Sequence, residues 1–220
     1  MTDAGDGVKR RAYDAASRQA ASRATRQRIV DAARTLFLER GYRKTTIAAV
    51  AAAAGVNADT VYALVGRKPV LLRELIEQAL SGTDHAVPAE EREAIRASRE
   101  ASDPVTKLEL YARSVRGVHG RLAPLFLAAR DAASTEPEAL AVWQEISDRR
   151  AANMRRMVAE LRDAAGDRFR AGLSIEEAAD TVWATNSPEL YVMLTGERGW
   201  SPDRYERWLA VTWRRLLLDR

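Results

Sequence analysis

Residues 45–65 read TTIAAVAAAAGVNADTVYALV, and this stretch decides how the N-terminal part of the chain folds. The alanine-rich run predicts a short helix over residues 47–53, which Gly55 ends because glycine adopts the left-handed conformation easily. Asn57 is a good N-cap and begins a second short helix that extends to about residue 65. Two short helices joined by so tight a turn cross at a wide angle, so we expect a helix–turn–helix unit whose second helix projects outwards.

A projecting helix of this kind fits the major groove of B-DNA, with its N-terminal residues against the base edges. Helix N-termini, hydroxyls and cations around it then contact phosphates. The same turn also occurs in ordinary helical bundles, where its role is packing alone. Asp59 either accepts a hydrogen bond from a cytosine amino group or only stabilises the start of its helix. The predicted base-facing residues are Asn57, Ala58, Asp59 and Thr60, and the predicted phosphate contacts are Thr45, Thr46, Tyr62 and Lys68.

Positive charge is concentrated at the N-terminal end of the chain. Residues 1–68 hold 13 Lys/Arg and 6 Asp/Glu, a balance of +7, whereas residues 69–220 hold 22 and 25, a balance of −3. This asymmetry favours a polyanionic partner, although a basic tail also simply aids solubility. We expect residues 1–24 to be a basic arm that is mobile without DNA and is helical, if at all, from about Tyr13.

Helical patterns flank the helix–turn–helix and continue to the end of the chain. The apolar stripe after Thr25 predicts a helix that Gly41 stops, and Pro69 is well placed to open a fourth helix. Residues 83–103 are charged and weakly periodic, so we expect a surface helix and loops there. No run of alternating β-branched residues occurs, and we predict an all-α fold of about nine helices. The later helices are expected over residues 104–119, 122–133 and 137–164. A further helix should start at a capping box at Ser174, with a kink or split at Pro188, and the last should run from an N-cap at Ser201 to near the end.

The N-terminal part resembles the DNA-binding region of the tetracycline-repressor (TetR) family. The matching residues are 25–42, Thr45-Thr46-Ile47, 51–56, Thr60-Val61-Tyr62, Lys68 and Leu71-Leu72. The chain departs from the family's pattern at Leu64 and Val65, where the family has His-Phe, and Pro69 replaces its usual acidic residue. The histidine contact to phosphate is therefore missing, and Arg67 is the candidate replacement cation.

The resemblance implies a homodimeric, ligand-responsive regulator of transcription. Such a protein binds double-stranded DNA at a palindromic operator and is released by a small-molecule effector; repressors are commoner in the family than activators. The implied domains are the arm (1–24), the helix–turn–helix domain (25–68) and an effector-binding and dimerisation domain (69–220). In the family the last two helices form the dimer interface, which predicts a stripe of Tyr205, Trp208, Leu209, Thr212 and Leu216 here, unless that stripe faces its own core.

The effector pocket of the family lies among the helices of the second domain. Aromatic and methionine side chains there suit a hydrophobic or aromatic effector, although residues of this kind more often form plain core. His119 and Asn186 are the more informative candidates, because each is polar beside an apolar stripe. The candidate pocket residues are Tyr111, His119, Phe126, Trp143, Asn153, Met154, Trp183 and Asn186.

Several other classes of protein are disfavoured. The chain has no cysteine, so disulfides and zinc–thiolate sites are excluded, and no metal or cofactor is expected. Its two histidines lie in different segments and no nucleotide-binding or hydrolase motif occurs, so we do not expect an enzyme. Neither a membrane span nor a signal-peptide core is present, which predicts a cytoplasmic location. The remaining alternative is a helical architectural protein that binds DNA or a partner without a ligand.

Overall fold

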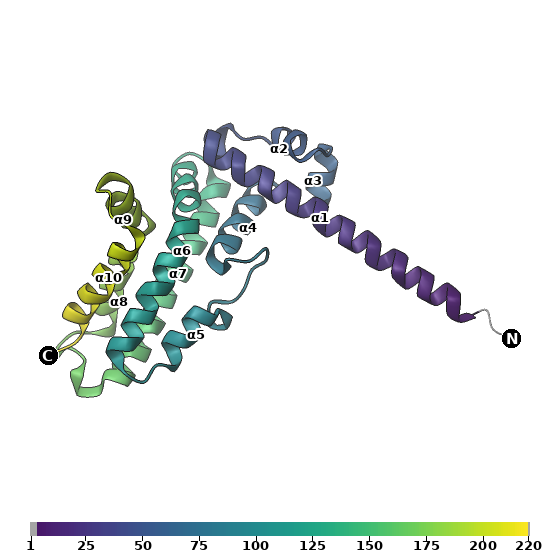
Figure 1. The fold of residues 1–220 in the computed structure, drawn as a ribbon. Coiled ribbons are helices and arrows are strands. Elements are labelled where there is room, and N and C mark those ends of the chain that lie inside the picture. Colours follow the sequence, from purple (N-terminus) through teal and green to yellow (C-terminus); the bar gives the residue numbers. More distant parts are fainter. Residues whose placement is uncertain (1–3, 220) are drawn as a thin grey trace. The chain divides into compact units, whose positions relative to one another are not determined.

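The computed structural model describes the backbone of residues 4–219 and the side chains of residues 17–219. The all-α prediction is confirmed: within this range the only strand-like feature is one isolated bridge between Phe169 and Leu218. Short 3₁₀ turns lie at Ala89–Glu91 and Gly166–Arg168, and a π-helical turn at Met193–Glu197. The α-helices are α1 (Ala4–Lys44), α2 (Ile47–Ala54), α3 (Ala58–Leu64), α4 (Lys68–Ser81), α5 (Glu93–Glu100), α6 (Pro104–Ala133), α7 (Pro137–Ala165), α8 (Ile175–Thr185), α9 (Pro188–Val192) and α10 (Pro202–Leu217) (Figure 1).

The chain divides into two compact units within α4, between Leu75 and Ile76. The predicted boundary lay earlier, at the start of this helix. Leu71, Leu72 and Leu75 are fully buried, and these apolar residues extend the first unit into α4. No single helix in the described residues is long and apolar enough to cross a membrane. Helices α2 and α3 have enough length and apolar character only when they are counted together, and they are bent by 96° relative to each other.

The first unit is built on α1, whose C-terminal part lies beside α2 and α3 (Figure 1). The predicted stripe is buried, with Ile29, Ala33 and Phe37 at most 1% exposed. Gly41 interrupts the helical backbone with φ 77°, as the sequence predicted for the end of this helix. The N-terminal end differs from the prediction, because α1 already begins at Ala4 and the backbone of the expected arm is helical from there. Residues 1–3 of the expected arm lie outside the described residues.

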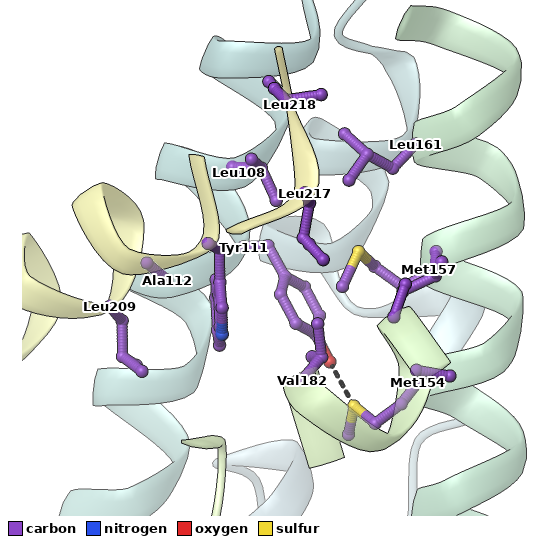
Figure 2. Close-up of a cluster of buried hydrophobic side chains, with 14 of the residues drawn as sticks. Leu108, Tyr111, Ala112, Met154, Met157, Leu161, Val182, Leu209, Leu217 and Leu218 are labelled. Carbon is purple, nitrogen blue, oxygen red and sulfur yellow. Dashed lines mark hydrogen bonds between the residues drawn. The ribbon is translucent and has the colours of Figure 1, made fainter. Parts of the chain in front are cut away.

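The second unit is a helical bundle in which α6 and α7 lie side by side (Figure 1). The sequence predicted a break near residues 120–121, but α6 is one continuous helix across Gly120 and Pro124. The capping box at Ser174 and the split at Pro188 are confirmed, as is the N-cap at Ser201. Its core joins α6, α7, α8 and α10 around Tyr111, and Figure 2 shows this ring among Met154, Met157 and Leu217.

Candidate DNA-binding surface and effector site

Local capping fixes the geometry of the α2–α3 pair. The Thr46 hydroxyl accepts a hydrogen bond from the Ala49 amide at 3.1 Å, and Gly55 ends α2 in the left-handed conformation at φ 68°. The Asn57 side-chain oxygen then accepts the Thr60 amide and the Thr60 hydroxyl, both at 2.7 Å. The helix axes differ in direction by 96°, so the predicted wide crossing angle is confirmed.

One face of α3 is free of the first unit's core. Val61 is fully buried and anchors the helix, whereas Tyr62 is 52% exposed. Asn57 and Asp59 are exposed too, and the amide nitrogen of Asn57 has no partner among the described residues. Thr60 and Ala58 are partly exposed. The start of α3 therefore presents donors, acceptors and an aromatic hydroxyl on one surface, which suits contact with base edges and phosphates.

Thr45 does not belong to this surface, contrary to the prediction. It is 1% exposed, and its hydroxyl donates to the carbonyls of Leu36, at 3.1 Å, and Gly41, at 2.9 Å. These bonds satisfy carbonyls at the C-terminal end of α1, where no helical amide follows. Thr45 therefore holds the turn between α1 and α2, while its neighbour Thr46 is exposed at the N-terminus of α2.

Two cations lie where the chain enters α4. The Lys68 ammonium donates to the Tyr42 carbonyl at 3.2 Å and lies 4.1 Å from the centre of the Tyr42 ring. This packing holds Lys68 at the first turn of α4 and leaves the side chain partly exposed. Arg67 is exposed beside it. Arg67 is therefore the more accessible of the two predicted phosphate contacts.

An ion pair that the sequence did not reveal ties three helices of the first unit together. The Arg26 guanidinium on α1 makes a bidentate pair with the Glu74 carboxylate on α4, with one contact at 2.6 Å, and donates to the Leu64 carbonyl at the end of α3. The Glu74 side chain is only 12% exposed. Bidentate geometry orients both partners, so the pair fixes α4 relative to the helix–turn–helix. Only proximity in the fold shows it, because the partners are far apart in sequence.

We expect this pair to contribute a coupling free energy of about 1 kcal/mol to folding, since Arg26 remains partly solvated. Unfolding free energies of Arg26→Ala, Glu74→Ala and the double variant give the coupling through a double-mutant cycle. The double variant should lose less stability than the sum of the two single losses. Exact additivity would show that the pair contributes nothing.

In the second unit, three predicted pocket residues come together. The Tyr111 hydroxyl donates to the Met154 sulfur at 2.9 Å, drawn dashed in Figure 2. The Asn186 amide lies 3.4 Å from both that hydroxyl and that sulfur. All three side chains are buried, so α6, α7 and the end of α8 meet at a polar contact within the core. Burial also raises the pKa of Tyr111, so its hydroxyl keeps its proton.

His119 is 2% exposed, and neither ring nitrogen has a hydrogen-bond partner among the described residues. Its ring lies 5.6 Å from that of Tyr191 and 6.3 Å from that of Tyr205. Burial, reinforced by the nearby Arg150 guanidinium, lowers the pKa of His119 to about 3. The imidazole is thus neutral at physiological pH and offers one donor and one acceptor.

The other predicted pocket residues lie in different surroundings. Phe126 is 2% exposed and is plain core, and Asn153 is partly exposed. Trp183 is 38% exposed on α8, where the Arg150 guanidinium lies 4.7 Å from its ring centre. Trp143 carries a buried indole N–H without a partner among the described residues. Sequence reasoning missed Arg150, because an arginine on a charged helix gives no signal of burial.

The predicted dimer stripe on α10 is partly wrong. Tyr205 and Leu209 are fully buried in the core of their own unit, beside Trp213. Trp208 and Thr212 are partly exposed, and Leu216 is 41% exposed. Val211, which the prediction omitted, is 47% exposed. Helical spacing therefore identified an apolar face correctly but assigned two of its residues to the wrong contact.

Comparison with known proteins agrees with this architecture. Residues 29–75 match the model of the bacterial regulatory proteins of the tetR family, a range that includes α2, α3 and the predicted DNA contacts. A search of curated proteins found no similar sequence.

Solved structures share the fold over most of the chain. NalD, the secondary repressor of the MexAB-OprM multidrug efflux pump in Pseudomonas aeruginosa, is 24% identical, with a TM-score of 0.69 over 90% of this chain and 98% of its own. The fatty acid degradation regulator FadR from Bacillus halodurans is 18% identical, with a TM-score of 0.69 over 89% and 97%. SmeT, solved in complex with triclosan, is 21% identical, with a TM-score of 0.69 over 89% and 92%. Residues 29–75 therefore form a DNA-binding domain of the tetR family of bacterial regulatory proteins, carried on a fold that the chain shares with these solved structures.

Proposed function

We propose that this protein is a transcriptional repressor that binds a palindromic operator as a homodimer and is released by a small-molecule effector. The observation that carries the proposal is the exposed N-terminal half of α3, directed 96° away from α2. The match of residues 29–75 to a family of bacterial regulatory proteins supports it, as does the resemblance to NalD, which is a repressor, and to SmeT, which was solved with a small molecule.

DNA contacts are divided between two sets of residues. Asn57, Asp59 and Thr60 face the bases, while Tyr62, Arg67 and Lys68 contact phosphates around them, together with the exposed Thr46 at the start of α2. Asn57 is suited to donate to the N7 acceptor of a purine, because its amide N–H group remains available while its oxygen caps α3. Two recognition helices in one dimer then require two half-sites of opposite orientation.

The dimer surface that we propose is the outer stripe of α10. It consists of Trp208, Val211, Thr212 and Leu216, which are spaced as one helical face and remain exposed or partly exposed. Exposed apolar side chains at this spacing favour burial against a second copy of the same helix. Tyr205 and Leu209 support that face from within the core.

Release follows from a change in the separation of the two recognition helices. An effector that binds one arrangement of the second unit more tightly shifts the population towards it, and α4 is continuous across both units. An effector with equal affinity for both arrangements has no influence on DNA binding.

Selection of genomic DNA fragments by the purified protein at physiological salt tests the proposal. We expect one enriched palindrome, bound at least about tenfold less tightly by Tyr62→Ala and Arg67→Ala. Arg162→Ala is the matched control, because Arg162 is an exposed arginine on α7 in the other unit, and it should leave affinity unchanged. Binding without a preferred sequence, and with strong salt sensitivity, would instead favour an architectural DNA-binding protein.

A further inference from the structure

The inner face of α7 changes from apolar to polar along its length. Met154, Met157 and Leu161 belong to the core cluster (Figure 2). Towards the N-terminus of α7 the same side continues with Arg150, Ser147 and Trp143, each about one turn from the next. The contact between Tyr111 and Met154 sets the register with the antiparallel α6 and places His119 opposite this polar stretch.

Polar atoms of these four residues are buried without partners among the described residues. They are both ring nitrogens of His119, the indole nitrogen of Trp143, the hydroxyl of Ser147 and the Nε of Arg150. A buried polar group left unpaired destabilises the folded chain, and folded proteins rarely leave several such groups together. Two of the four, Trp143 and Arg150, can only donate. A ligand that pairs with these groups would therefore need to be rich in acceptors.

Arg150 adds a partly buried positive charge to this stretch. Its guanidinium donates to the carbonyls of Trp183 and Asn186, and no carboxylate of the described residues lies within ion-pair distance of it. The nearby carboxylate of Glu189 pairs instead with Arg130 at 2.7 Å. Burial raises the pKa of Tyr205, as it does that of Tyr111, so neither hydroxyl supplies a negative charge.

The Arg150 guanidinium is partly buried, and a cation that has lost part of its hydration favours an anionic partner. The guanidinium itself stays protonated, although burial lowers its pKa, because an arginine side chain does not lose its proton in proteins. A negatively charged ligand would therefore be favoured beside Arg150.

We infer that the effector is a small organic acid whose carboxylate binds Arg150, with Ser147 and Trp143 as further donors. This inference rests on the proposed function, since it specifies the effector of the regulator. His119 lies across from these donors and holds the polar end of the ligand through its neutral ring. The apolar core around Tyr111 and Met154 borders the same site and suits the hydrocarbon part of the acid.

Matched acids and amides test the inference, because each pair differs in charge but hardly in shape. We would measure dissociation constants at neutral pH by calorimetry for benzoate and benzamide, naphthoate and naphthamide, and octanoate and octanamide. At least one acid should bind about tenfold or more tightly than its amide. Arg150→Gln should reduce that ratio to near one, whereas Arg156→Gln, an exposed arginine on the same helix, should retain it.

Ser147→Ala is a second variant, chosen because its hydroxyl makes no bond within the described residues whose loss would disturb folding. It should weaken acid binding about threefold or more without changing the thermal midpoint of the ligand-free protein. If no acid binds more tightly than its amide, or if Arg150→Gln keeps the preference, the inference is wrong and ordered water pairs these groups.

Operator binding by the same preparations separates the two proposals. Sequence-specific DNA binding without any preference for acids would support the proposed regulator function and contradict the proposal of an acidic effector. A preference for acids in a protein that selects no DNA sequence would do the reverse. Release of the selected operator by the preferred acid, and not by its amide, is the result expected if both hold.

Discussion

Trp213→Ala should lower the unfolding free energy by about 3–5 kcal/mol, the range for removing a large buried aromatic side chain. The Trp213 side chain is fully buried, and its ring centre lies 5.5 Å from that of Tyr111 on α6. Its indole N–H donates to the Thr185 hydroxyl on α8 at 2.8 Å. One side chain thus joins α6, α8 and α10, so its removal leaves a cavity and breaks a hydrogen bond together.

Urea denaturation followed by circular dichroism measures this loss, at a fixed protein concentration because dimerisation would otherwise shift the midpoint. Trp213→Phe should lose less, because it keeps most of the apolar contact and forfeits mainly the bond to Thr185. Leu140→Ala is the matched surface control, since Leu140 is 37% exposed, and its effect should stay well below that of Trp213→Ala. A loss under about 1 kcal/mol for Trp213→Ala would show that α10 packs differently.

Local signals explain which parts of the fold were predictable from sequence. Asn57 and Ser174 cap helices where the sequence predicted, because a capping bond joins residues only three apart. The split at Pro188 is local for the same reason, since proline lacks the amide that would continue the helix. The helix–turn–helix is an assembly of such signals, so its two helices and their turn were predicted from sequence.

The continuity of α6 was not predictable from local signals. Gly120 and Pro124 both argue for a break, yet the flanking Leu122 and Phe126 are at most 2% exposed. Burial of these side chains against neighbouring helices outweighs the local cost of a proline inside a helix. Such burial depends on residues far away in the sequence, so propensity alone cannot show it.

The functional residues show the same difference between local signals, which the sequence reveals, and contacts between distant segments, which it does not. An amphipathic stripe shows that a helix has an apolar face but not whether that face meets its own core or a partner, which is why Tyr205 and Leu209 were misassigned. The ion pair of Arg26 with Glu74 and the meeting of His119 with Arg150 join distant segments. Charged residues on helices usually face solvent, so only the folded arrangement distinguishes these few.

His119 should make the protein markedly less stable in mild acid. Its pKa is about 3 in the folded chain, lowered by burial and by Arg150, but close to the ordinary value of 6.5 when the chain is unfolded. Between these values the unfolded chain binds a proton that the folded chain does not, so stability is full above about pH 7 and falls as the pH decreases. The slope approaches about 1.4 kcal/mol per pH unit, or about 2 kcal/mol between roughly pH 6.5 and roughly pH 5.

Unfolding free energies measured across this interval should show the slope in the wild type and lack it in His119→Leu, which has no group to protonate. His85→Gln is the control that keeps the slope, because His85 is exposed and pairs only with its neighbour Asp84. Capping hydrogen bonds lower the pKa values of Asp103 and Glu177. The contribution of these carboxylates to the unfolding free energy is therefore lost only at lower pH. Between these pH values the change in unfolding free energy therefore reports on the His119 imidazole. An equal slope in the wild type and in His119→Leu would show that His119 is solvated or paired in solution.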